Sequence, residues 1–221
     1  MKGGNNMETE EKIIQKIKQD PFYIQYIENP SEEIQLEAVK RYGYTIRCIK
    51  NPSEKVQLMA VIRNGFALQF IKNPSEEIQL AAVEEDGRSI QFIKNPSEEV
   101  QLMAVIGNGF ALQFIKNPSE KIQLAAVKQN GCAIKLIKNP SEKVQLAAVK
   151  EDRSSIQYIE NPTEETQLES VKQNGKNIIF IKHPTEKVIR TAILNGAKKE
   201  YLKHVDISEL SDETKLMTEL L

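Results

Sequence analysis

The sequence predicts an all-α protein, namely an α-solenoid of tandem 22-residue helix-turn-helix repeats with N- and C-terminal caps. Two observations predict this fold. An Asn-Pro dipeptide recurs every 22 residues without an insertion, and apolar residues recur at fixed positions behind it. Because two helices this short are not stable alone in water, each repeat must stack on its neighbours. The Asn-Pro dipeptides begin at Asn29, Asn51, Asn73, Asn95, Asn117, Asn139 and Asn161, and His183 with Pro184 continues the series.

The repeats define the domain organisation. Eight of them fill residues 29–204, and residues 7–28 form a ninth, degenerate copy with isoleucines in register. We therefore expect one solenoid over residues 7–204. Residues 1–6 are predicted to be disordered, because a polar terminal segment has little to pack against. Residues 205–221 are predicted to form a C-terminal capping helix.

The repeat at residues 117–138 (NPSEKIQLAAVKQNGCAIKLIK) illustrates the expected elements. Asn caps helix N-termini well and Pro suits the first helical position, so the first helix is expected to start at Pro118. Gly131 is expected to end it by adopting the left-handed conformation common at helix C-termini. A second, shorter helix should follow over residues 132–138, until the next Asn-Pro stops it. Arg153 stands where most repeats have Gly, so its turn is a predicted site of strain or bending.

The motif that carries these elements is NPSEEIQLAAV, followed by an Asn-Gly turn and a short Ile-Gln-Phe-Ile-Lys segment. It resembles an uncharacterised 22-residue Asn-Pro-Ser/Thr-Glu helical-repeat family of bacteria and large DNA viruses. The resemblance spans nearly the whole chain. It implies a helical-repeat architecture and a phage or viral origin, and it carries over neither an activity nor site residues.

Position 7 of each repeat, counted from the Asn as position 1, holds a column of glutamines. Positions 6, 8, 11 and 18 are mostly Ile, Val or Leu and form the predicted core. Position 7 falls toward the interior on a helical wheel, so its amide should be hydrogen-bonded, either to an adjacent repeat or to free carbonyls. The alternative is an exposed amide ladder that grips the backbone of an extended peptide. The column is Gln35, Gln57, Gln79, Gln101, Gln123, Gln145 and Gln167.

One face of the first helices is a candidate binding surface. Positions 5, 9 and 12 share this face, which is charged or small in most repeats. Two repeats instead carry Met and Ile on it and Phe just after the turn, and the repeat between them carries an acid and a base at equivalent positions. An exposed patch of this kind is typical of partner binding. The predicted partner-binding residues are Met59, Ile62, Phe66, Glu84, Arg88, Met103, Ile106 and Phe110.

Duplication, packing or self-association could also account for this patch. The repeats that start at Asn51 and Asn95 match at 20 of 22 positions, so a duplication could have copied the patch without selection for binding. Packing against a neighbouring helix could bury these side chains. The patch could instead contact a second copy of the chain, so a monomer or a weak homodimer is expected.

Composition and motifs argue against several functional classes, although they do not exclude nucleic-acid binding. The 30 Lys and Arg residues balance 31 Asp and Glu residues, so no strong field attracts nucleic acid or an anionic membrane. No apolar run reaches the roughly 18–20 residues that span a bilayer, and no signal peptide is present, which predicts a cytoplasmic protein. Cys48 and Cys132 are too few for a disulfide framework or a zinc site. Without a phosphate loop, metal-ligand spacing or a nucleophile beside a base, we expect no enzymatic activity, cofactor or metal.

The leading hypothesis is a non-enzymatic scaffold or inhibitor that binds a protein or peptide partner through the exposed face of its first helices. The alternative is a protein that binds or sequesters nucleic acid or nucleotides, encoded by a virus or phage and acting on host defence. Basic side chains would then contact phosphates and aromatic rings would stack on bases. The residues for this alternative are Lys40, Arg41, Lys128, Lys150, Arg153, Lys172 and Lys176, with Tyr44, Phe66 and Phe110. A self-assembling structural protein is a third hypothesis.

Overall fold

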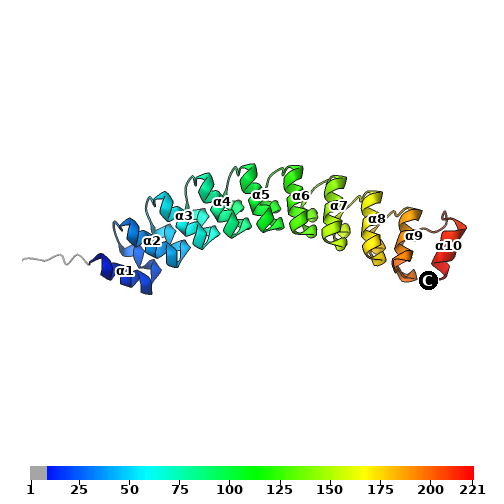
Figure 1. Ribbon diagram of the computed structural model, residues 1–221, viewed down its shortest axis with the longest axis horizontal. Coiled ribbons are helices and arrows are strands. Elements are labelled where there is room, and N and C mark those ends of the chain that lie inside the picture. Colours follow the sequence, from blue (N-terminus) through cyan, green and yellow to red (C-terminus); the bar gives the residue numbers. More distant parts are fainter. Residues whose placement is uncertain (1–8) are drawn as a thin grey trace, which may run out of the picture. The chain divides into compact units, whose positions relative to one another are not determined.

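The computed structural model describes residues 9–221, and every regular element in that stretch is a helix. It confirms an α-solenoid in which each repeat holds one α-helix and one short 3₁₀ helix, labelled η. The chain divides into two compact halves, Met1–Gly107 and Asn108–Leu221. Within each half, successive α-helices lie side by side and pack on one another (Figure 1). The disorder predicted for residues 1–6 falls outside the described residues, as does the start of the degenerate first repeat.

The helices follow the repeat in both halves. The N-terminal half consists of α1 (Glu10–Gln19), η1 (Pro21–Tyr26), α2 (Glu32–Arg41), η2 (Gly43–Cys48), α3 (Glu54–Arg63), η3 (Gly65–Phe70), α4 (Glu76–Glu85), η4 (Gly87–Phe92) and α5 (Glu98–Gly107). The C-terminal half consists of η5 (Gly109–Phe114), α6 (Glu120–Gln129), η6 (Gly131–Leu136), α7 (Glu142–Glu151), η7 (Arg153–Tyr158), α8 (Glu164–Gln173), η8 (Gly175–Phe180), α9 (Glu186–Leu194), η9 (Lys199–Leu202) and α10 (Asp212–Glu219).

The α-helices begin later than the sequence predicted. The expected start at Pro118 is wrong, because α6 begins at Glu120 and its N-cap is Ser119. The Ser119 hydroxyl accepts a hydrogen bond from the Ile122 N–H at 3.4 Å, and Ser or Thr at position 3 caps α2, α3, α7 and α8 in the same way.

The Asn at position 1 makes the turn before the helix instead of capping it. Its backbone φ is between 50° and 52° at Asn51, Asn73, Asn117 and Asn139. This is the left-handed region, which Asn enters more readily than most residues. The Asn-Pro signature therefore marks a tight connection from one repeat to the next.

Gly131 does not end a helix in the left-handed region, contrary to the prediction. The α6 helix ends at Gln129, Asn130 follows with an extended φ of −154°, and Gly131 is already the first residue of η6. A Cβ atom on Gly131 would lie 2.6 Å from the carbonyl oxygen of Ala148 in the next repeat. Gly is required here because the next α-helix approaches closely.

The second helix of the repeat is also shorter and tighter than predicted. It spans Gly131–Leu136 as a 3₁₀ helix rather than residues 132–138. The side chain of Asn130 caps it by accepting a hydrogen bond from the Cys132 N–H at 3.0 Å. Asn or Asp at position 14 plays this part for η1 and for η3 to η8.

Arg153 is accommodated without the strain that the sequence suggested. The η7 helix forms over the same positions as the other 3₁₀ helices, and Arg153 has no positive φ. The next repeat differs instead. It replaces the usual Ala at position 10 by Ser170, whose hydroxyl donates to the Arg153 carbonyl at 3.1 Å. The Asn177 side-chain amide donates to the same oxygen, also at 3.1 Å.

The core of each half follows positions 6, 11 and 18, which are buried from α2 through η8. Position 8, also predicted as core, is only half-buried in the five repeats from Leu58 to Leu146. Small side chains at positions 10 and 17 are buried instead, as shown by Ala60 and Ala67, which are fully inaccessible. Their small size lets neighbouring α-helices approach closely, and position 8 then lies at the rim.

Candidate functional site

The predicted apolar patch lies largely on the outer surface of three neighbouring helices, α3, α4 and α5. We call this surface the α3–α5 face, and it consists of Leu58, Met59, Ile62, Leu80, Ala81, Glu84, Leu102, Met103 and Ile106. Ile62 is 50% exposed and Ile106 is 55% exposed. Met59 packs partly against the core, and Met103 is likewise half-buried. Glu84 is exposed on the helix between the two isoleucines.

Phe66 and Arg88 contact each other and belong to the 3₁₀ helices η3 and η4. The Phe66 ring packs against Phe92 with centroids 5.6 Å apart, and the Arg88 guanidinium lies 5.3 Å from the Phe66 centroid. Arg88 also binds the Asp86 carboxylate, with Nη2 to Oδ2 at 2.6 Å. This hydrogen bond lowers the pKa of Asp86, opposed in part by burial. Arg88 is therefore engaged by neighbours within its own half.

Phe110 lies in the C-terminal half, on η5. Its ring is half-buried, and the Lys135 ammonium lies 4.8 Å from its centroid. The eight predicted residues thus divide into five on the α3–α5 face, two on the neighbouring 3₁₀ helices and one in the other half.

The glutamine side chains at position 7 donate hydrogen bonds to free backbone carbonyls, which is one of the two bonding patterns that the sequence predicted. In all seven repeats the side-chain amide nitrogen donates to the carbonyl oxygen of the Pro at position 2 of the same repeat, at 2.8–3.1 Å. Gln145 also bonds to the next repeat, where its Oε1 accepts from the Thr163 N–H at 3.0 Å. The side chains are half-buried or buried, so they do not form the exposed ladder of the alternative.

A second exposed column, at position 20, was not predicted from the sequence. It is aromatic in most repeats and at least 36% exposed in seven of the nine, whereas Cys48 is half-buried and Leu202 is buried. A 3₁₀ helix has three residues per turn, so side chains three residues apart lie on the same face. Positions 18 and 21 therefore both face the core, while position 20 faces outward. The recurring apolar residue before the last Ile of each repeat was the available signal. The column is Tyr26, Phe70, Phe92, Phe114, Leu136, Tyr158 and Phe180.

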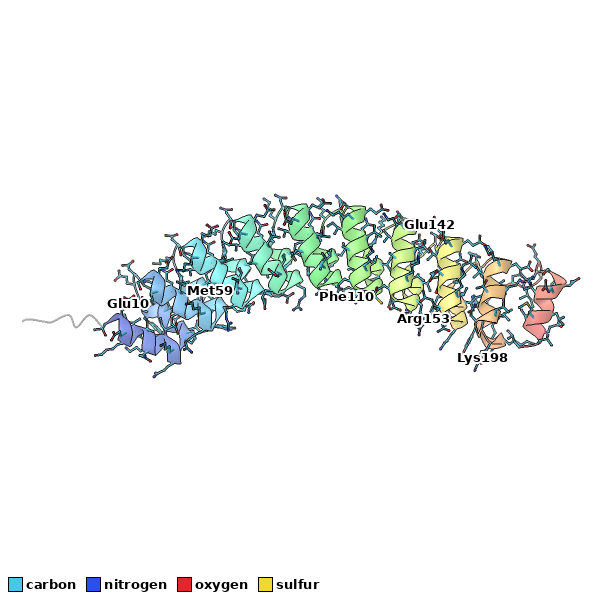
Figure 2. The ribbon with its side chains drawn as sticks, in the orientation of Figure 1. Glu10, Met59, Phe110, Glu142, Arg153 and Lys198 are labelled. Carbon is cyan, nitrogen blue, oxygen red and sulfur yellow. The ribbon has the colours of Figure 1, made fainter. Side chains whose placement is uncertain are left out.

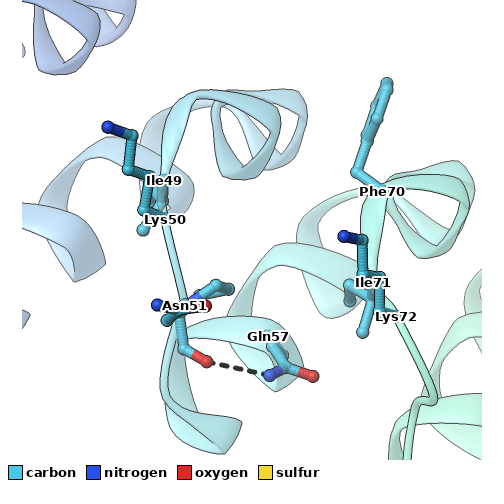
Figure 3. Close-up of a pocket in the computed structure, with 8 residues that line it drawn as sticks. Ile49, Lys50, Asn51, Gln57, Phe70, Ile71 and Lys72 are labelled. Carbon is cyan, nitrogen blue, oxygen red and sulfur yellow. Dashed lines mark hydrogen bonds between the residues drawn. The ribbon is translucent and has the colours of Figure 1, made fainter.

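This column forms one wall of a groove between adjacent repeats. In the N-terminal half the groove has a volume of about 620 Å³ and is lined by Ile49, Lys50, Asn51, Pro52, Gln57, Phe70, Ile71 and Lys72 (Figure 3). Gln57 lies on its floor, bonded to the Pro52 carbonyl at 2.8 Å. The same positions line two grooves of the C-terminal half, of about 340 and 400 Å³.

A different groove lies on the α-helices of the C-terminal half, between α6 and α7. Its volume is about 470 Å³, and it is lined by Leu124, Lys128, Lys143, Leu146, Ala147, Lys150 and Glu151. It occupies the positions that are apolar on the α3–α5 face, but lysines replace the isoleucines at position 12. Figure 2 shows Glu142 and Arg153 at opposite edges of the repeat that contains α7.

Cys132 is poorly placed for nucleophilic chemistry. Burial raises the pKa of its thiol, and so does the Asp152 carboxylate, whose Oδ2 accepts a hydrogen bond from Sγ at 3.3 Å. A raised pKa reduces the thiolate fraction that attacks an electrophile. Among residues 9–221, no group of three or more His, Cys, Asp or Glu side chains is arranged to hold a metal ion.

The part of the chain that the structure describes contains no helix that is both long and apolar enough to cross a membrane. The chain matches no family model, no curated protein and no solved structure. The resemblance to a helical-repeat family of bacteria and large DNA viruses therefore stays a prediction.

Proposed function

We propose that this protein is a non-enzymatic, cytoplasmic scaffold or inhibitor that binds a protein or peptide partner through the α3–α5 face. The observation that carries the proposal is the exposure of Ile62 and Ile106 at a position that is Lys or Glu in most other repeats. Full burial of such a side chain is worth about 1.5–3 kcal/mol, so covering the exposed half of both would contribute about 2 kcal/mol to binding.

The rest of the face supports a docking surface. Met59 and Met103 flank the isoleucines, and flexible thioether side chains adapt to a partner's shape. Half-buried leucines from Leu58 to Leu102 extend the apolar area across three helices. An amphipathic helix that presents apolar anchors would suit this surface.

Glu84 restricts the chemistry of the partner. Its carboxylate is exposed between the isoleucines, and it forms no hydrogen bond or ion pair with the described residues. A partner that covers Glu84 must supply a cation or donors, because burying an unpaired charge is costly. We therefore propose a partner segment with Lys or Arg between two apolar anchors.

The test compares two charge-introducing double variants in an affinity pull-down from nuclease-treated lysate. Ile62→Glu with Ile106→Glu should abolish capture of the partner, whereas Lys128→Glu with Lys150→Glu should retain it. Both pairs occupy position 12 and introduce the same residue, but they lie in different halves.

Measurements on the purified variants distinguish partner binding from packing and from self-association. Thermal unfolding of the isoleucine variant should stay close to that of the unmodified protein, because both side chains are exposed. A large loss of stability would show that the isoleucines are structural and would defeat the proposal. A mass that depends on concentration and falls to the monomer in the isoleucine variant would show self-association instead.

A further inference from the structure

The groove in Figure 3 combines three chemical features in one repeat. Phe70 forms an aromatic wall, the ammonium groups of Lys50 and Lys72 stand at the rim, and the Gln57 amide lies on the floor. Of the described residues that line this groove, none carries a carboxylate. It is therefore locally cationic, although the chain as a whole has a formal charge of −1.

The lysines at position 22 are available to a ligand. Lys50, Lys72 and Lys94 occupy this position in three successive repeats of the N-terminal half, and all are exposed. None of them forms a hydrogen bond or an ion pair with another described residue.

The aromatic side chains beside these lysines are held in place. Phe70 is 38% exposed, and its ring contacts Tyr44 with centroids 5.6 Å apart at an interplanar angle of 72°. Phe92 is 36% exposed and contacts Phe66 at the same centroid distance. Rings braced in this way lose little conformational freedom when a ligand stacks on them.

We propose that this row, formed by Lys50, Phe70, Lys72, Phe92 and Lys94, binds single-stranded nucleic acid. Lysine ammoniums contact the phosphates, and the two phenylalanines stack on bases. Aromatic platforms beside a cationic track are the general means of binding single strands. Helical-repeat proteins that bind RNA also contact about one base per repeat. This surface is separate from the α3–α5 face and does not depend on it.

An acidic peptide is a weaker fit to the same row. Its carboxylates would satisfy the lysines, but it would leave the exposed flat rings of Phe70 and Phe92 without a matching group. A nucleotide supplies both an anion and a planar ring, at a spacing that recurs along the strand. The alternation of Lys and Phe from Lys50 to Lys94 favours such a periodic ligand, whereas Glu160 replaces one lysine in both grooves of the C-terminal half and makes them less suited to an anion.

The experiment is a fluorescence anisotropy titration with labelled oligothymidylate and oligouridylate over a series of salt concentrations. Each lysine–phosphate contact lowers the slope of log K against log salt concentration by about 0.7, where K is the association constant. Three lysines therefore predict a slope of about −2. Replacing Lys50, Lys72 and Lys94 by Gln should abolish that slope. Replacing Lys128, Lys143 and Lys150 by Gln removes the same charge from the α-helices of the other half and should leave binding unchanged.

A second pair of substitutions tests stacking. Phe70→Leu with Phe92→Leu should weaken binding by at least about fivefold while leaving the salt slope unchanged. Leucine already occupies position 20 in the repeat of Leu136, so these variants should fold. Ile62→Glu with Ile106→Glu should bind the oligonucleotides normally, which separates this proposal from the partner-binding function.

Several results would overturn the proposal. These are no binding at low salt, equal weakening by both lysine triples, and unchanged affinity in the phenylalanine variants. Polyglutamate that competes as well as an oligonucleotide of equal charge would show an acidic-peptide or general anion site instead.

Discussion

Replacing Gly65 by Ala should destabilise the protein through contact between repeats. A Cβ atom there would lie 2.4 Å from the Ala82 carbonyl oxygen and 2.6 Å from the Ser89 hydroxyl. The hydroxyl can rotate away, but the carbonyl belongs to the backbone of α4 and must move by about 1 Å to reach an ordinary contact. Such overpacking costs about 1–3 kcal/mol, of which the reduced entropy of the unfolded chain offsets about 0.4–1 kcal/mol.

Gly107→Ala provides a matched control in the same half. Gly107 is the exposed last residue of α5, and a Cβ atom there would meet only the Val83 carbonyl oxygen, at 3.8 Å. The same substitution should therefore stabilise the protein by about 0.5–1 kcal/mol.

The assay is thermal unfolding followed by circular dichroism on all three proteins. At about 2–4 °C per kcal/mol for a chain of this size, Gly65→Ala should melt several degrees below the unmodified protein and Gly107→Ala slightly above it. Equal melting temperatures, or a more stable Gly65→Ala, would refute the reasoning that close approach selects Gly at position 15.

Two further predictions concern ionisable groups. Asp152→Asn should shift the reaction of Cys132 with a thiol reagent to lower pH. The Asp152 carboxylate raises the pKa of the Cys132 thiol in addition to burial, and the substitution removes that effect. An unchanged pH profile of the reaction would show that burial alone raises the pKa. Arg88→Gln should reduce stability most above pH of about 4, the unfolded pKa of Asp. Arg88 lowers the pKa of Asp86 in the folded state, so the ion pair stabilises the protein above the unfolded pKa of Asp86, and this stabilisation is lost as the pH falls through the folded pKa. Melting temperatures measured over a pH series should therefore show the difference between the variant and the unmodified protein shrinking toward acid. A difference that does not depend on pH would contradict a role for the ion pair.

The period of the sequence was sufficient to predict the α-solenoid, because a strict repeat constrains every copy to one shape. It was not sufficient to place the helix ends. Asn117 and Ser119 are both good capping residues, and only the turn made by the Asn-Pro pair decides between them. Gly131 was misinterpreted for a related reason. A helix-ending Gly and a Gly that admits a neighbour look alike in sequence, and the neighbour is 17 residues away at Ala148.

The candidate surfaces were predictable in part. The change of character at position 12 located Ile62 and Ile106 correctly on an exposed helix face. Phe66 and Arg88 were predicted to lie in the same patch as the isoleucines. Their spacing in sequence could not show that these two side chains instead contact each other across two 3₁₀ helices. The column that includes Phe70 was missed because a short apolar segment shows no difference between an α-helical and a 3₁₀ period.

The contact around Arg153 limits how the chain can be rearranged. In five repeats the Gly at position 15 lies against the backbone carbonyl of the Ala at position 10 of the next repeat, so these interfaces share one close contact. The repeat with Arg153 is different, because its carbonyl depends on Ser170 and Asn177 of its successor. Moved in front of any Ala-bearing copy, it would lose both donors and would bring a side chain where the interface has room for a hydrogen atom. These two repeats are therefore matched to each other, and we expect a graft to preserve this interface only when it carries both of them, as one 44-residue unit.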